Sequence, residues 1–292
     1  MKEGEKMYQA GLVMEGGGMK GVYTSGVLDF FLDKDILFSS CYGVSAGACN
    51  MCSYLSGQRK RSFDVIADYI EDKHYCGSYS MLTTGDIFNV KMCYHQIPEQ
   101  LNPYDYQAFK AYQGKAYAVA TNVVTGRAEY LRVRDMKKDI YAIRASASLP
   151  LVSRTVSYRG SLYLDGGIAD AIPIKRSILG GNNKNVVIMT KEEGYVRPPE
   201  GMLPLLRARY IKYPEVYRLM KRRHEMYNDT IDYLAEQEKA GRAFIIRPRD
   251  KGTVGRIERD RSKLEALYEI GYQDAEKKYD QLMAYLTDGH HK

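Results

Sequence analysis

Short apolar runs alternate with segments of helical periodicity from the start of the chain to about residue 190. The runs typical of β-strands cover residues 9–14, 41–44, 116–124, 128–133, 156–158, 162–164 and 185–190. Apolar residues recur at helical spacing over residues 19–33, 45–56, 63–70 and 139–147. This alternation predicts an α/β fold whose sheet is largely parallel and carries helices on both faces.

Turn residues and breaks refine this picture. Thr125-Gly126-Arg127 separates the fourth run from the third, and Arg159-Gly160-Ser161 separates the sixth from the fifth. Each triplet predicts a hairpin. Residues 72–102 follow no clean period and include Gly77, Gly85 and Pro98, so we expect an irregular flap over one end of the sheet.

The pattern changes after Pro198-Pro199. Residues 203–240 and 261–286 are charged and helical in period, and residues 243–246 form a strand-like run between them. We therefore place a boundary near residue 195. It divides the chain into an α/β domain, residues 1–195, and a mainly helical C-terminal annex, residues 196–292.

Composition narrows the class of protein without fixing its function. The chain has 292 residues, of which 45% are hydrophobic and 27% charged, with a net charge of +7. These values exclude a disordered chain and are compatible with an anionic partner or with none. The first ten residues lack the apolar core of a signal peptide, and no run is long enough to span a bilayer. We expect a cytoplasmic protein that touches the inner face of the membrane peripherally if at all.

Among the five cysteines, Cys49 and Cys52 form a lone CxxC. A zinc site of this type needs a second such pair or two histidines at ligand spacing, and neither is present. We interpret the cysteines as small apolar residues of a reduced protein, and we expect no metal and no cofactor.

The first candidate catalytic motif is Gly43-Val44-Ser45-Ala46-Gly47, between a predicted strand and a predicted helix. A GxSxG at such a junction makes a sharp turn that presents the serine at the N-terminus of the helix, where the dipole favours negative charge. The same residues would also suit a plain turn that caps a core helix. By itself the motif leaves both interpretations open.

A glycine cluster lies at the preceding strand-to-helix junction, Gly16-Gly17-Gly18-Met19-Lys20-Gly21. Successive glycines let several backbone N–H groups point into one concavity, which can hold an oxyanion or a phosphate. The spacing fits neither of the common nucleotide-binding glycine motifs. Lys20 either orients the loop electrostatically or is a solvated helix residue.

The third group is Leu164-Asp165-Gly166-Gly167, at the end of a predicted strand. A carboxylate in this position can accept a proton from a neighbouring hydroxyl, although Asp-Gly is also a common turn dipeptide. Asp170 is close enough in the sequence to compete for the role of base. Like the serine and the glycine cluster, Asp165 ends a strand, which is where open α/β sheets build their sites.

Together these groups resemble the patatin-like phospholipase family. The GGGxKG loop at residues 16–21, the GxSxG at residues 43–47 and the DGG at residues 165–167 occur in the family's order. Ala145-Ser146-Ala147-Ser148-Leu149-Pro150 is similar to the block ahead of the family's aspartate. Lys20 departs from the pattern, since family members more often carry arginine there.

This resemblance implies a three-layer α/β/α fold and lipid acyl hydrolysis without a metal. It implies that Ser45 is the nucleophile, that Asp165 is its base, and that Gly16, Gly17, Gly18 and Met19 supply the oxyanion hole. Lys20, Gly21, Gly43, Gly47, Gly166 and Gly167 would support these motifs. The annex after residue 195 lies outside the resemblance.

A histidine base is the main alternative to this Ser–Asp pair. His224 follows Asp165 in the order of α/β-hydrolase triads, but the adjacent Lys221, Arg222 and Arg223 indicate a surface helix. His74 and His95 fall in the expected flap, and His290 and His291 lie in the terminal tail.

Three further alternatives concern function. The glycine loop and basic annex would also suit a non-catalytic protein that binds phosphate or an anionic membrane. An acyl-enzyme on Ser45 could also pass its acyl group to an alcohol. Residues 205–223 carry seven basic residues, with Tyr210, Tyr213 and Tyr217 between them, and form either a contact for anionic lipid or a solvated helix face. We expect no nucleic acid partner.

Overall fold

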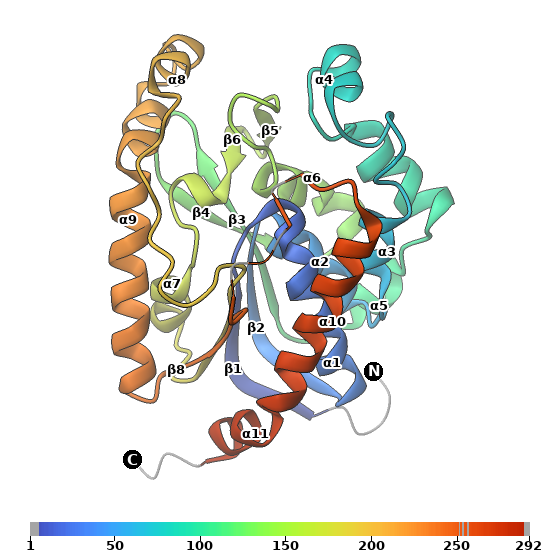
Figure 1. Ribbon diagram of the computed structural model, residues 1–292, viewed down its shortest axis with the longest axis vertical. Helices are drawn as coiled ribbons and strands as arrows, with labels where there is room; N and C mark the ends of the chain where they lie inside the picture. Colours follow the sequence, from blue (N-terminus) through green and yellow to red (C-terminus); the bar gives the residue numbers. More distant parts are fainter. Residues whose placement is uncertain (1–5, 251, 253, 256, 289–292) are drawn as a thin grey trace.

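The computed structural model describes residues 6–250, 252, 254–255 and 257–288, and in these residues eight strands form one sheet (Figure 1). The strands are β1 (Lys6–Met14), β2 (Ile36–Val44), β3 (Lys115–Asn122), β4 (Ala128–Val133), β5 (Val156–Tyr158), β6 (Ser161–Asp165), β7 (Asn185–Ile188) and β8 (Ala243–Ile246). Strands β3, β2, β1, β7 and β8 run parallel, whereas β4, β5 and β6 pair in antiparallel fashion near β3. The predicted α/β fold with a largely parallel sheet is confirmed.

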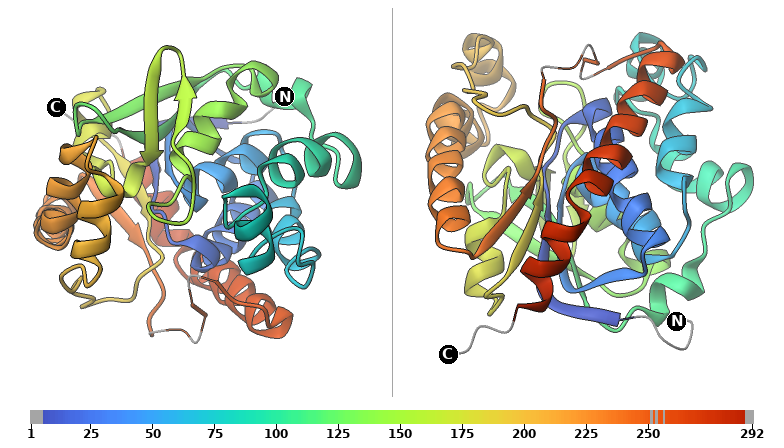
Figure 2. Two further views of the ribbon diagram at one scale, coloured as in Figure 1. Left: turned by 90° about the horizontal axis from the view of Figure 1, so that it is seen from above. Right: turned by 60° about the horizontal axis from the view of Figure 1, so that its bottom comes forward.

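Helices cover both faces of this sheet, so the molecule has three layers (Figures 1 and 2). On one face lie α1 (Val22–Asp33), α2 (Ala46–Leu55), α3 (Arg61–Ala67) and α10 (Arg261–Lys277). On the other lie α7 (Ile174–Leu179) and α9 (Pro214–Lys239). The remaining helices are η1 (Gly18–Gly21), α4 (Ser78–Thr84), η2 (Met92–Leu101), α5 (Tyr106–Ala111), α6 (Met136–Ser146), η3 (Gly166–Ile168), α8 (Leu203–Arg209) and α11 (Tyr279–Thr287). None of the described helices is both long and apolar enough to cross a membrane.

The central strands are apolar on both sides because each side has its own core. In β1, Leu12 and Met14 belong to the core shared with α1 and α2, whereas Val13 belongs to the core beneath α9. Side chains of a strand alternate between faces, so a strand buried on both faces reads as a continuous apolar run. Residues 9–14 form such an apolar run, which is why they are predicted to be a strand.

Three expectations about local structure need correction. Residues 72–102 are not irregular, since they contain α4 and η2, and η2 is wound as a π-helix that includes Pro98. A π-helix does not repeat every 3.6 residues, so no clean period appears in the sequence. The expected helix over residues 203–240 is two helices, because Pro214 disfavours helical geometry at Tyr213 and begins α9. The helices α5 and α7, six residues each, were missed because they are too short to show a period.

The sheet continues past residue 195, because β8 pairs in parallel with β7. Helix α10 also packs tightly on α1. A Cβ atom added at Gly26 would lie 2.1 Å from the carbonyl oxygen of Tyr268, and one added at Gly271 would lie 2.1 Å from that of Tyr23. The two backbones therefore approach at glycines from both helices. The boundary near residue 195 marks a change in sequence character, and a separate domain beyond it stays a prediction.

Candidate active site

Ser45 occupies the turn between β2 and α2. Its φ of 54° lies in the left-handed region, which is unusual for a residue with a side chain. The turn is tight, because a Cβ added at Gly43 would lie 2.5 Å from Cα of Ala48 and one at Gly47 would lie 2.5 Å from the carbonyl oxygen of Met14. Two glycines thus give the backbone the room that this sharp turn requires.

The glycine loop lies directly against this turn. A Cβ atom added at Gly16 would lie 2.9 Å from that of Ser45, and Gly18 has a φ of 59° that favours glycine. Gly21 fits against the start of α2, where Nδ2 of Asn50 donates to its carbonyl oxygen at 2.7 Å. Lys20, half-buried in η1, lies next to Gly21. The loop after β1 and the N-terminus of α2 therefore form one packed unit.

Asp165 ends β6, which runs antiparallel to β3 and approaches the Ser45 turn from the direction opposite to β2. Val119 of β3 pairs with Val44, the last residue of β2, and the next residue, Ala120, pairs with Asp165 at the end of β6. Strand β4 occupies the other edge of β3 at both positions, so β2 and β6 share one edge and meet end to end. Because the chain turns into Ser45 at this point, the register brings Ser45 and Asp165 together.

The backbone around Asp165 is fixed on several sides. Its Oδ1 accepts from the N–H of Gly167 at 2.8 Å, and its carbonyl oxygen accepts from the hydroxyl of Thr121 at 2.8 Å. A Cβ added at Gly166 would lie 2.1 Å from the carbonyl oxygen of Val119, so this position admits only glycine. The carboxylate is buried, with 2% of the residue exposed.

Residues 145–150 connect the two motifs. The backbone N–H of Ser45 donates a hydrogen bond to the hydroxyl of Ser146 at 2.9 Å. The backbone N–H of Asp165 donates one to the carbonyl oxygen of Ser148 at 2.8 Å. This short segment therefore positions both Ser45 and Asp165. The sequence singled it out through the family resemblance, and these two bonds give it a physical role.

Helix α9 contributes two side chains that sequence reasoning did not connect with the site. Nε of Arg223 donates to the carbonyl oxygen of Gly167 at 2.6 Å. One turn later, the hydroxyl of Tyr227 donates to Oε1 of Glu15 at 2.7 Å. Glu15 is buried, precedes the glycine loop, and also accepts the N–H of Thr190 at 2.7 Å. No motif in the sequence signals these contacts, since they join residues more than 50 positions apart.

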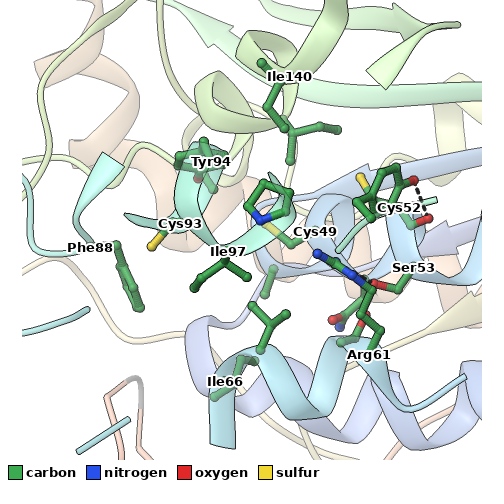
Figure 3. A pocket seen from close by; sticks show the side chains of 18 of the residues that line it. Cys49, Cys52, Ser53, Arg61, Ile66, Phe88, Cys93, Tyr94, Ile97 and Ile140 are labelled. Atoms are coloured by element: carbon green, nitrogen blue, oxygen red, sulfur yellow. Dashed lines mark hydrogen bonds between the residues drawn. The ribbon is translucent and has the colours of Figure 1, made fainter. Parts of the chain in front are cut away.

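Ser45 lines a cavity of about 180 Å³. Figure 3 shows side chains that form part of the wall of this cavity. Gly18 and Met19 line it beside Ser45, and apolar side chains such as those of Ile97 and Ile140 form much of its wall. The part of the wall that η2 supplies was not predicted from the sequence, because η2 lies in the segment expected to be irregular. An apolar cavity that reaches a serine beside a carboxylate suits an acyl chain attached to a reacting carbonyl.

Cys49, one turn after Ser45, also lines this cavity. The residue is exposed to the cavity, but the surrounding protein atoms desolvate its thiol and raise the pKa to about 12, and the nearby charge of Asp165 contributes to the increase. A thiol with such a pKa stays neutral and is a poor nucleophile at neutral pH. The described residues include no cluster of histidine, cysteine and acidic side chains suited to a metal ion.

The alternative bases lie elsewhere. No histidine is among the described residues that line the cavity: His74 and His95 are exposed, and His224 is half-buried on α9. The hydroxyl of Tyr130 donates to Oδ2 of Asp170 at 2.6 Å, and burial raises the pKa of Asp170. His290 and His291 lie outside the described residues.

Comparison with known families agrees with this architecture. The sequence model of the patatin-like phospholipase family matches residues 12–177, which include the glycine loop, Ser45 and Asp165. The chain therefore belongs to the patatin-like phospholipase family. A second family model, described only as a domain of unknown function (DUF6363), matches residues 213–287.

Two curated relatives cover parts of the chain. It is 32% identical over 185 residues to the uncharacterized protein YjjU of Escherichia coli (strain K12), a match that covers 61% of this chain and 51% of the relative. It is 26% identical over 195 residues to the probable lipid hydrolase 463L of invertebrate iridescent virus 6, with 61% and 66% covered. The chain thus spans between half and two thirds of the length of these relatives.

Proposed function

We propose that this protein is a lipid acyl hydrolase that uses Ser45 as nucleophile and Asp165 as general base. The observation that carries the proposal is the meeting of β2 and β6 along one edge of β3, next to an apolar cavity that Ser45 lines. Membership of the patatin-like phospholipase family and the similarity to a probable lipid hydrolase support it.

In the proposed reaction, Oγ of Ser45 attacks the ester carbonyl while its proton passes to Asp165. The carbonyl oxygen becomes an oxyanion, and the C–O bond to the alcohol then breaks as Asp165 returns the proton to the leaving group. Water attacks the resulting acyl-enzyme in the same way and releases the fatty acid and free Ser45. No cofactor enters this sequence of steps.

The oxyanion donors are proposed to be backbone N–H groups of the loop formed by Gly16, Gly17, Gly18 and Met19. The N–H of Ser45 itself already donates to Ser146, and the N-terminus of α2 adds a favourable dipole. Losing one such donor costs about 2.7–4 kcal/mol in the transition state. Because a carboxylate is a weak base for a hydroxyl, this loop must supply much of the rate enhancement.

Ser45→Ala tests the proposal directly. We expect no hydrolysis of p-nitrophenyl esters and no reaction with a fluorophosphonate probe, while circular dichroism and thermal melting stay close to wild type. Cys49→Ala is the matched control, since it removes the neighbouring thiol from the same cavity wall and should retain labelling. A wild-type protein that fails to react with the probe would instead support non-catalytic binding.

We also propose that helix α8 and the residues after it contact anionic lipid. Arg207, Arg209 and Lys212 are exposed there, together with the apolar residues Met202, Leu205 and Ile211, which are 50%, 50% and 78% exposed. Basic and apolar side chains side by side are typical of a membrane-surface contact. Tyr210 is buried and Arg223 faces Gly167, so the surface is smaller than the expected residues 205–223.

A further inference from the structure

The cavity follows one face of α2 for two turns. Ser45 and the α2 residues Ala46, Cys49, Asn50, Cys52 and Ser53 line it, and they recur at the spacing of a single helix face. From Ser45 to Ser53 the helix rises about 12 Å, at about 1.5 Å per residue. The cavity is therefore an elongated space with the reacting serine at one end.

Arg61, the first residue of α3, lies at the other end. Figure 3 shows its side chain beside Ser53 and directed into the cavity. Nη1 of Arg61 is 3.5 Å from Oγ of Ser53, and Nη2 donates to the carbonyl oxygen of Asn102 at 2.9 Å. The guanidinium also lies over the ring of Tyr104, 4.9 Å from its centre.

The guanidinium of Arg61 forms no ion pair with any residue that the structure describes. Its Nε is buried without a hydrogen-bond partner in the described part of the chain. Burial lowers the pKa of Arg61, because the charged form is poorly solvated there. By contrast, Arg154 pairs with buried Asp86 and Arg159 with buried Asp139. A partly desolvated cation without a counterion favours an anionic ligand.

We propose that Arg61 forms an anion subsite in the acyl cavity, and that the protein acts on esters whose acyl chain ends in a carboxylate or a similar anionic group. The inference rests on the proposed function of Ser45, because it assigns the far end of the same substrate. It makes Arg61 a residue that determines specificity and takes no part in the bond-breaking steps.

Distance identifies the acyl chain as the part that carries the anion. Carbon–carbon bonds of about 1.5 Å advance an extended chain by about 1.25 Å per carbon, so about 12 Å corresponds to about ten carbons. In a glycerophospholipid the phosphorus is about five or six bonds from the ester carbonyl, within about 7 Å. A headgroup phosphate is thus too close to Ser45 to reach Arg61, whereas the end of a ten-carbon chain reaches it.

The test compares p-nitrophenyl decanoate with the p-nitrophenyl monoester of decanedioic acid, which differs only in its terminal carboxylate. We expect the wild type to prefer the dioate in kcat/KM, and Arg61→Met to reduce the ratio of dioate to decanoate by tenfold or more. Arg61→Lys, which keeps the charge, should retain part of the preference. Arg59→Met is the matched control, since Arg59 pairs with Asp33 outside the cavity and the ratio should stay at its wild-type value.

Chain length supplies a second measurement that needs no variant. The wild type should prefer the dioate only near ten carbons, and the corresponding hexanedioate should be disfavoured against hexanoate. A ratio that is equal in wild type and Arg61→Met, or that does not depend on length, overturns the anion subsite while the hydrolase stands. Absence of both ester hydrolysis and fluorophosphonate labelling in the wild type would overturn the proposed function as well.

Discussion

The residues matched by the patatin-like phospholipase model and those matched by the domain of unknown function contact the active site in different ways. Residues 12–177 supply Ser45, Asp165 and the glycine loop, and they fix these groups through backbone turns and close approaches at glycine. Residues 213–287 supply side chains that hold the loops from outside, namely Arg223 on Gly167 and Tyr227 on Glu15.

This difference explains why the first region carries recognisable site motifs in its sequence and the second does not. Turns that admit only glycine leave short motifs with fixed spacing, so the chemistry is visible in the first part. A supporting hydrogen bond from a long helix needs one residue at one position, and it leaves no motif. The second part thus resembles an ordinary charged helical region in its sequence, although it contacts Gly167 and Glu15, which lie beside the candidate catalytic residues.

Separation of the two matched regions is expected to have the largest effect. A chain ended at residue 195 would lose β8 and α9 and would expose the face of α1 that packs on α10 at Gly26 and Gly271. We expect this fragment to fail to fold, because an uncovered β7 edge and an exposed core favour aggregation. Circular dichroism and limited proteolysis measure the outcome, and a folded, active fragment would show that the second part is dispensable.

Asp165→Asn is expected to have the next largest effect, and it acts within the first part alone. The amide oxygen can still accept the N–H of Gly167, so the loop should keep its shape while the charge is lost. We expect kcat/KM to fall by about a thousandfold or more, and the double variant with Ser45→Ala to be little worse than either single one. His224→Gln is the control for a histidine base, and loss of activity there with an intact fold would argue for a triad.

Tyr227→Phe tests the contribution of the second part to the chemistry. It removes a buried hydrogen bond to Glu15, a change that costs about 1–3 kcal/mol when the acceptor stays buried. We expect kcat to fall about tenfold with KM nearly unchanged, because the glycine loop is proposed to act on the transition state. Tyr233→Phe makes the same chemical change on α9, and that tyrosine instead lies near Lys175. Equal kinetic effects of the two variants would mean that Tyr227 only stabilises the fold.

Much of the fold and the candidate catalytic residues could be predicted from the sequence. It indicated the strands of the parallel sheet because these are buried on both faces, and the family resemblance singled out residues 145–150. It predicted the hairpin of β5 and β6 but not that β6 also pairs with β3 in antiparallel fashion, since a pairing between distant segments leaves no local pattern. It also could not show that η2 and Arg61 border the cavity, because their contacts with α2 join segments separated along the chain.

The contact between α1 and α10 predicts a pH dependence of stability. Oδ2 of Asp29 accepts from the hydroxyl of Tyr268 at 2.7 Å, and burial raises the pKa of Asp29 from 3.8 to about 6. Because the pKa is higher in the folded protein, the neutral carboxyl favours folding. This stabilisation is complete below about pH 3.8 and is lost as the pH rises through about 6.

Asp29→Asn should remove that dependence, because the amide stays neutral and can still accept from Tyr268. We expect the melting temperature of the variant, relative to wild type, to increase between about pH 4 and pH 7. Asp33→Asn is the contrasting control, because the bond with Arg59 lowers the pKa of Asp33 below 3.8. That variant should lose relative stability only as the pH rises toward about 3.8, and its relative melting temperature should stay nearly constant between about pH 4 and pH 7. The same pH trend in both variants would contradict this account of the interface.

The smallest effect is expected from charge reversal on the proposed lipid contact. Arg207, Arg209 and Lys212 are exposed and are not among the residues that line the cavity, so changing all three to glutamate should leave hydrolysis of a soluble ester within about twofold of wild type. Each basic residue near an anionic surface contributes about 1 kcal/mol to binding, so sedimentation with phosphatidylserine vesicles should fall sharply at low salt.

The control changes Lys110, Lys137 and Lys138 to glutamate, which alters the net charge by the same amount at exposed positions near α5 and α6. If both triple variants lose binding equally, net charge alone governs the association and α8 has no special role. If the α8 variant alone loses binding while soluble turnover is kept, the segment between the two matched regions holds the protein at the membrane, separately from the contacts that α9 makes with Glu15 and Gly167.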